Sequence, residues 1–222
     1  MPGRRDSPLS RTAIPPHDGV EIISDDVVWN GRFPLQVVKF RNRRFDGAMS
    51  GVRTWELWRR GNAAAVLPYD PISDHVVVIE QFRLPALAAG VDPVLVELAA
   101  GLADGADDET LEQVAIRESR EEMGLAVDRL ERVGSFILTP GGSDENCTLF
   151  AGRVRLGDLP DDGLIGHGGL ASENEDIRVR ALPAQTAIDA AIAGHYPNSV
   201  ATIGLLWLAA RRDWLRDIWS RP

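Results

Sequence analysis

The spacing of apolar and polar residues divides the chain into a β-rich first part and a mixed second part. Three β-favouring segments, 20–23, 35–40 and 52–58, are separated by Asp, Asn and Gly residues typical of turns. They predict a small antiparallel β unit at 18–60. The polar, proline-containing residues before it, 1–17, predict a flexible tail.

The rest of the chain, 61–222, alternates between strand and helix patterns. Apolar runs predict strands at 63–67, 75–83, 94–99, 130–138, 148–156 and 177–182, with a turn at 68–71. Two helices, 184–194 and 199–219, end the chain, and Pro197 and Asn198 provide a start signal for the second. This order predicts an α/β fold of the α+β kind, an α/β/α sandwich around a mixed sheet.

One helix has clear signals at both ends and is expected at 111–123. Thr110 and Gln113 have the spacing of a capping box, in which each residue bonds the backbone of the other. Gly124 suits the left-handed residue that follows many helices. The packing face is expected to consist of Leu111, Val114, Ala115 and Ser119.

Glu118, Glu121 and Glu122 fall on another stripe of this helix, which we expect to face solvent. Like charges at these spacings repel by about a few tenths of a kcal/mol per pair, so the arrangement is useful only with a cation among them. Mg²⁺ takes oxygen ligands and commonly bridges carboxylates to substrate phosphates. Taken alone, however, such a charged run could equally be a solvated helix surface.

Composition narrows the function classes. The net charge of −9 argues against a general nucleic-acid-binding surface, because such binding depends on neutralising phosphates. Lys39 is the only lysine, so nearly all positive charge is arginine, whose forked donors suit phosphate. Cys147 is the only cysteine, which fits a reducing cytoplasm. The first residues do not resemble a signal peptide, and the apolar run 203–210 is too short to span a bilayer, so we expect no membrane partner.

The run Arg117-Glu118-Ser119-Arg120-Glu121-Glu122-Met123-Gly124-Leu125, preceded by Glu109 with seven residues between, resembles the Nudix box, Gly-x5-Glu-x7-Arg-Glu-U-x-Glu-Glu-x-Gly-U with U apolar. Two positions differ. Ser119 replaces an apolar residue, and seven residues instead of five separate Gly101 from Glu109. The insertion precedes the helix and leaves the carboxylates in register. The resemblance implies a Nudix hydrolase domain at 61–222, preceded by the small antiparallel β unit.

Two later segments are similar to the ADP-ribose pyrophosphatase branch of this family. Pro140 follows Leu125 at about the distance found in that branch and is followed by two glycines, although Pro-Gly-Gly is also ordinary turn chemistry. Residues 167–177 resemble the loop and strand entry that complete the site in bacterial ADP-ribose pyrophosphatases, although they could be a solvated loop. The resemblance covers about residues 20–217.

This resemblance implies hydrolysis of the pyrophosphate of ADP-ribose to AMP and ribose 5-phosphate. Another nucleoside diphosphate sugar, such as GDP-mannose or ADP-glucose, is the alternative substrate. A non-catalytic nucleotide-binding regulator is the alternative from another class, but all charged positions of the box are present and no helix-turn-helix pattern is attached.

The resemblance also implies residue roles. The implied metal ligands, for Mg²⁺ or alternatively Mn²⁺, are the carbonyl of Ala100 and the carboxylates of Glu118, Glu122 and Glu175. The implied catalytic residues are Glu173 as a mobile general base, Glu121 in an outer-shell or bridging role, and Arg117, paired with Glu109 to orient the helix.

Substrate contacts are implied for Arg83, Arg53, Phe33, Arg32 and Glu145. Arg83 would contact the pyrophosphate, although it could be a surface arginine at a strand end. Phe33, or alternatively Trp29, would stack on adenine, and Glu145 would hydrogen-bond the terminal ribose. The family also implies a homodimer whose β unit at 18–60 reaches the neighbouring site. Trp55 and Trp58 could cover that contact or equally be core residues.

Overall fold

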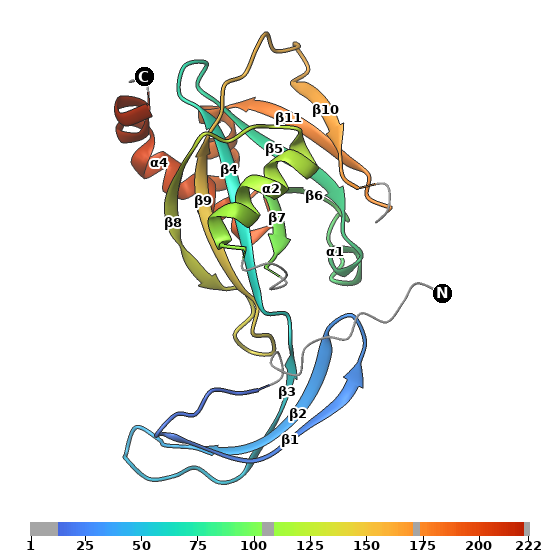
Figure 1. The fold of residues 1–222 in the computed structure, drawn as a ribbon, viewed down its shortest axis with the longest axis vertical. Coiled ribbons are helices and arrows are strands. Elements are labelled where there is room, and N and C mark those ends of the chain that lie inside the picture. The colour runs from blue at the N-terminus through green and yellow to red at the C-terminus, as the bar shows by residue number, and fades with distance from the viewer. Residues whose placement is uncertain (1–12, 104–108, 171–173, 220–222) are drawn as a thin grey trace. The chain divides into compact units, whose positions relative to one another are not determined.

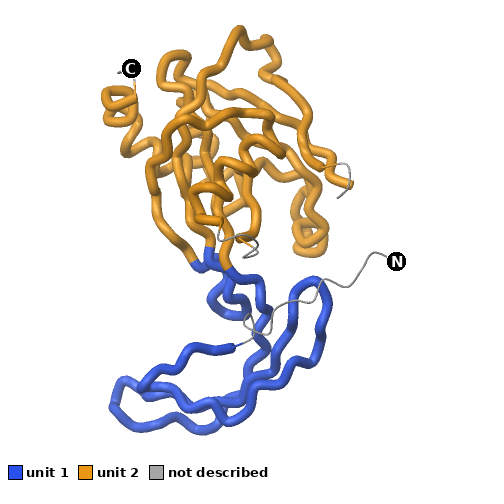
Figure 2. Tube along the Cα trace, viewed as in Figure 1, with its two compact units in different colours: residues 1–61, 137–146 blue, residues 62–136, 147–222 orange. Residues whose placement is uncertain are grey.

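A computed structural model describes residues 13–103, 109–170 and 174–219 (Figure 1). The chain forms two compact units (Figure 2). Unit 1 contains residues 1–61 and 137–146, and unit 2 contains residues 62–136 and 147–222. Most of the predicted tail, 1–12, lies outside the described residues.

Unit 1 contains an antiparallel sheet of three strands, in the order β1-β2-β3. The strands are β1 (Val20–Asn30), β2 (Pro34–Asn42) and β3 (Arg53–Trp58). The predicted antiparallel β unit is therefore confirmed. Strand β1 is longer than predicted, because the polar residues 24–26 and the residues up to Asn30 also pair with β2, with two shifts in register.

The second segment of unit 1, 137–146, is attached to β3 by hydrogen bonds. The Trp58 N–H donates to the Gly142 carbonyl (2.8 Å), and the Asp144 N–H donates to the Trp58 carbonyl (3.3 Å). The Trp55 indole N–H donates to the Gly141 carbonyl (2.8 Å). The glycine turn noted in the sequence therefore pairs with the β unit.

Unit 2 is built on an eight-stranded sheet in the order β10-β11-β5-β4-β9-β8, with β6 paired to β5 and β7 to β4. Its strands are β4 (Asn62–Asp70), β5 (His75–Phe82), β6 (Val94–Glu97), β7 (Ala99–Leu102), β8 (Arg129–Ile137), β9 (Asn146–Arg153), β10 (Leu164–Gly168) and β11 (Ile177–Pro183). The helices are α1 (Leu84–Ala88), α2 (Leu111–Met123), α3 (Ala184–Ile192) and α4 (Ser199–Trp219).

Strand residues alternate between two packed layers. Val66 and Ile79 belong to the same buried cluster as Val114 of α2. Leu67 faces the other way and lies beside Gly204 of α4. Figure 1 shows α2 across one face of the sheet and α4 against the other. The predicted α/β/α sandwich is confirmed. No helix among the described ranges is long and apolar enough to cross a membrane.

Two local predictions were wrong. The turn predicted at 68–71 is displaced because β4 continues to Asp70, whose carboxylate accepts the backbone N–H groups of Ile72 and Ser73 (2.9 and 3.4 Å). Pro68 is tolerated in β4 because it lies between the residues that pair with β7 and those that pair with β5.

The strand predicted at 94–99 is two strands, since the chain changes partner from β5 to β4 at Leu98. Helix α1 and strand β10 were not predicted; α1 is only five residues long, and its face has no buried residue to give a periodic signal.

Candidate active site

Helix α2 has the bounds expected from the sequence. Thr110 Oγ1 accepts the Gln113 N–H (3.3 Å), and Gln113 Oε1 accepts the Thr110 N–H (2.8 Å), so the capping box is complete. Gly124 ends the helix with φ of 68°. These caps fix the register in which the glutamates of α2 point towards the rest of unit 2.

The carboxylates of Glu118 and Glu122 do not face solvent as expected. Their residues are only 9% and 5% exposed, as buried as much of the core. Two glycines allow this close packing. A Cβ on Gly101 of β7 would lie 1.7 Å from Glu118 Oε1, and one on Gly168 of β10 would lie 1.8 Å from the backbone oxygen of Glu122. The helix edge is therefore covered by two strands that come from distant parts of the chain.

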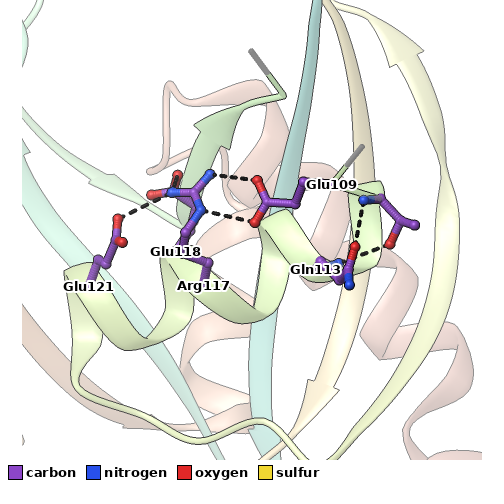
Figure 3. Close-up of polar contacts among 6 residues, drawn as sticks. Glu109, Gln113, Arg117, Glu118 and Glu121 are labelled. Atoms are coloured by element: carbon purple, nitrogen blue, oxygen red, sulfur yellow. Dashed lines mark hydrogen bonds and ion pairs between the residues drawn. The ribbon is translucent and has the colours of Figure 1, made fainter. Parts of the chain in front are cut away.

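The Arg117 guanidinium connects three carboxylates (Figure 3). Its Nε and Nη2 donate to the two oxygens of Glu109 (3.1 and 3.3 Å), which confirms the predicted pair. Its Nη1 donates to Glu118 Oε1 (2.6 Å) and Glu121 Oε2 (3.2 Å). The hydrogen bond to Glu109, with the charges of Glu118 and Glu109, raises the pKa of Arg117. This arginine therefore stays charged and orients the acidic edge of α2.

Burial raises the pKa of Glu122 to about 8, and the negative charges of Glu118 and Glu175 add to the effect. The Ala100 N–H opposes it by donating to Glu122 Oε2 (3.1 Å). Burial also raises the pKa of Glu118, although Arg117 opposes that rise. The ionised forms of both carboxylates are therefore disfavoured in this environment unless further positive charge is present.

Arg83 and Glu175 complete the described part of this cluster. The Leu170 N–H donates to Glu175 Oε2 (3.1 Å). Arg83 donates from Nε and Nη2 to Glu97 Oε2 (2.9 and 2.6 Å). Burial lowers the pKa of Arg83, but its bond to Glu97 and the charges of Glu97, Glu122 and Glu175 raise it above the ordinary value. Arg83 is thus within electrostatic reach of the predicted metal ligands.

The chemistry of this cluster fits a divalent cation. Its donors are oxygens, which Mg²⁺ prefers, and the side-chain space at Glu118 exists only because Gly101 lacks a Cβ. Within the described ranges, no group of three or more acidic, histidine or cysteine side chains is placed so that it could hold a metal ion by itself. Mg²⁺ usually completes its shell with substrate phosphates and water and seldom relies on protein ligands alone.

The predicted base Glu173 lies outside the described residues, so its role stays a prediction. Glu121 is partly exposed, and its carboxylate bonds Arg117. The backbone of Glu121 also accepts the Gly169 N–H (3.2 Å), which joins α2 to the residues after β10.

Three of the predicted substrate-binding residues gather around Arg60 in unit 1. The Arg60 guanidinium lies 4.2 Å from the Phe33 ring centroid and donates to both Glu145 oxygens (3.1 Å each). Arg32 lies over the same Phe33 ring at 5.6 Å. The Phe33 ring also meets Trp58 edge-on, with centroids 5.9 Å apart. Arg60 was not predicted from the sequence. Its place two positions after Trp58 was the available signal, but its partners Phe33 and Glu145 are remote in sequence.

Arg53 is not part of this group, because it begins β3 and Trp58 ends it. Its guanidinium lies 4.8 Å from the Trp55 ring centroid and 5.5 Å from that of Phe40. Both aromatic residues line an apolar hollow of about 230 Å³ within unit 1. Unit 1 therefore presents two separate arginine and aromatic clusters, and the acidic cluster belongs to unit 2.

A scan against protein-family models finds no match to this chain. Among characterised proteins, the chain is 38% identical over 203 residues to the ADP-ribose pyrophosphatase of Escherichia coli K12, covering 90% of this chain and 93% of that protein. It is 38% identical over 205 residues to the ADP-ribose pyrophosphatase of Haemophilus influenzae, covering 91% of each. A GDP-mannose pyrophosphatase of Cronobacter sakazakii is 35% identical over 172 residues, covering 77% of this chain and 84% of that one.

A solved structure described as an ADP compounds hydrolase shares the fold. Its TM-score is 0.60 at 19% identity, and the match covers 92% of this chain and 98% of the other. The matches to the bacterial enzymes cover nearly the whole chain. This chain belongs to the Nudix pyrophosphohydrolases, in the branch of the ADP-ribose pyrophosphatases.

Proposed function

We propose that this enzyme hydrolyses the pyrophosphate of ADP-ribose to AMP and ribose 5-phosphate in the cytoplasm, with Mg²⁺ or Mn²⁺ as cofactor. The observation that carries the proposal is the buried pair Glu118 and Glu122. Arg117 holds Glu118, and Glu122 is within reach of the Arg83 charge. Such a pair needs positive charge, which a cation and Arg83 would supply. The identity to enzymes named ADP-ribose pyrophosphatases supports this substrate.

In the proposed site, Glu118, Glu122, Glu175 and the carbonyl of Ala100 hold the cation. When bound, a divalent cation neutralises the charge that develops on the pyrophosphate. Arg83 supplies a further positive charge. Glu97 holds two of its nitrogens, and the third, Nη1, makes no hydrogen bond to a described residue, so Nη1 is the donor proposed to meet the pyrophosphate.

The remaining residues orient the ligands, accept the proton of water and bind the substrate. Arg117 keeps Glu118 in one orientation through its 2.6 Å bond. Glu173 takes the proton of the attacking water, and Glu121 is the second candidate for that step. In unit 1, Arg32, Phe33 and Glu145 bind the adenosine and ribose groups, and Arg53 binds a phosphate. The guanidinium of Arg32 lies over the Phe33 ring, and that of Arg53 lies over the Trp55 ring.

The GDP-mannose pyrophosphatase relative favours a second candidate substrate. ADP-ribose, GDP-mannose and ADP-glucose should therefore be compared at equal concentration with Mg²⁺, and the products identified. We expect the highest kcat/KM with ADP-ribose and the products AMP and ribose 5-phosphate. A matched reaction containing a chelator controls for the metal. A kcat/KM for GDP-mannose at or above that for ADP-ribose would assign the enzyme to the other substrate.

We also propose that two copies of the chain form a homodimer through the β unit at 18–60. The support is the exposed apolar surface of unit 1, since surface patches of this kind mark interfaces in soluble proteins. Its exposed residues on β1 and β3 include Val20, Ile22, Ile23, Val27, Val28, Trp29, Trp55 and Trp58. Two identical copies covering the same patch would give a closed dimer.

Light scattering at micromolar concentration should accordingly give the mass of a dimer. Val28→Glu should shift the mass towards the monomer and lower activity, because Val28 is 56% exposed in β1 and the variant would bury a charge in the interface. Ile192→Glu is the matched control, since Ile192 is 66% exposed on α3 in unit 2. A fully active monomeric wild type would contradict the proposal.

A further inference from the structure

Glu97 is a buried carboxylate that joins the start of α4 to the site arginine. It lies at the end of β6 with a side chain only 8% exposed. Its Oε2 accepts both bonds from Arg83, and its Oε1 accepts the Asn198 side-chain N–H (3.0 Å). Each oxygen of Glu97 therefore has a partner, as a buried carboxylate requires.

Asn198 has two roles at the start of α4. Its Oδ1 accepts the Ala201 N–H (2.9 Å), which caps the helix as the sequence indicated. Its Nδ2 points to Glu97, 101 positions away in the chain. The amide thus uses its oxygen for the helix and its nitrogen for Glu97. An aspartate could cap α4 equally well but could not donate to Glu97.

We infer that Asn198 is a positioning residue that acts on the reaction through Glu97 and Arg83. By holding Oε1, its amide fixes the Glu97 carboxylate so that Oε2 receives Nε and Nη2 of Arg83 together. The Arg83 guanidinium is then fixed in plane, with Nη1, which bonds none of the described residues, directed to an anion. This inference rests on the proposed function, because it takes the anion to be the pyrophosphate of the substrate.

Fixing Arg83 in advance has a physical benefit. An arginine loses side-chain freedom when it binds a ligand in one orientation, and less is lost when the guanidinium is already held. The Arg83 side chain is 41% exposed, so without its two hydrogen bonds to Glu97 it would sample several rotamers. Misplacement of a group by about 1 Å can cost a hundredfold in rate, so a residue that does not touch the substrate can still control turnover.

The test uses Asn198→Asp in the full-length enzyme, with Thr202→Ala as the matched control. The aspartate keeps the cap of α4 but faces Glu97 with an acceptor in place of a donor. Thr202→Ala removes a bond at the same helix turn, from Thr202 Oγ1 to the Tyr196 carbonyl (2.9 Å), without touching Glu97. We expect about a tenfold loss of kcat/KM for ADP-ribose in Asn198→Asp and less than about a twofold change in the control.

Coupling through Arg83 separates positioning from general destabilisation. In an Arg83→Ala background, Asn198→Asp should cause no further loss of kcat/KM, because the residue it positions is absent. Asn198→Ser, which also caps a helix but adds no charge, should repeat the result. An equal loss in the presence and absence of Arg83 would overturn the inference.

A second readout needs no substrate. The Arg83 Nε–H signal in an ¹⁵N NMR spectrum can be assigned by its loss in Arg83→Ala. It should be protected from exchange in the wild type and in Thr202→Ala, and it should lose that protection in Asn198→Asp. An unchanged signal in Asn198→Asp would refute the positioning role. If the wild type failed to cut ADP-ribose, the proposed function would fail, while this signal would still decide whether Asn198 positions Arg83.

Discussion

Glu122→Gln is expected to lower kcat for ADP-ribose by at least about a hundredfold at saturating Mg²⁺, because it removes one ligand charge from the proposed cation site. The carboxylate is buried against β7, and its Oε2 accepts the Ala100 N–H at 3.1 Å. Glutamine can accept the same bond and has nearly the same volume. The substitution therefore removes charge while it preserves packing.

Folding should survive this change. Burial and the charges of Glu118 and Glu175 raise the pKa of Glu122 to about 8, so the ionised carboxylate is costly to bury in the folded protein. A neutral amide avoids that cost, and the variant should melt at or above the wild-type temperature when no divalent ion is present. Activity and stability would then move in opposite directions, which a merely structural residue would not produce.

Glu112→Gln provides the control for this experiment. Glu112 is on the first turn of the same helix and is exposed, so the same chemical change occurs away from the cluster. Its rate should stay within about twofold of wild type. A Glu122→Gln enzyme that keeps more than about a tenth of the wild-type rate would show that this carboxylate is not a required ligand.

Local signals in the sequence predicted α2 closely. The capping box of Thr110 and Gln113 and the left-handed Gly124 depend only on residues within one turn of the helix ends, so they can be read without knowledge of the fold. The pair between Arg117 and Glu109 was equally accessible, since it joins two positions of one motif.

Burial of the glutamates could not be predicted in this way. It depends on Gly101 and Gly168, which reach α2 only after β7 and β10 have joined the sheet. Arg60 was missed for a related reason, because its carboxylate partner is 85 positions away. Helical periodicity describes one element at a time, whereas these contacts exist only between elements.

Glu173→Gln is expected to lower kcat by about 10²–10⁴-fold while Mg²⁺ and ADP-ribose affinities remain within a few-fold of wild type, as for loss of a general base. The described carboxylates of the cluster are poor candidates for this role. Glu118 and Glu121 both accept hydrogen bonds from Arg117, so their carboxylates are already engaged by that guanidinium. Glu122 is buried and proposed as a ligand, so Glu173, which lies outside the described residues, stays the predicted base.

Glu175→Gln is the matched comparison, two positions along the chain. Its Oε2 accepts the Leu170 N–H at 3.1 Å, which orients the carboxylate as expected of a ligand. Gly169 leaves room for it, because a Cβ there would lie 2.7 Å from the Glu175 Cβ. Loss of Glu175 should weaken Mg²⁺ binding, whereas loss of Glu173 should not. Calorimetric Mg²⁺ titration and steady-state kinetics on both variants separate the two roles. If Glu173→Gln keeps its kcat, or loses metal affinity as Glu175→Gln does, the base must be sought at Glu121, which remains partly exposed beside Arg117.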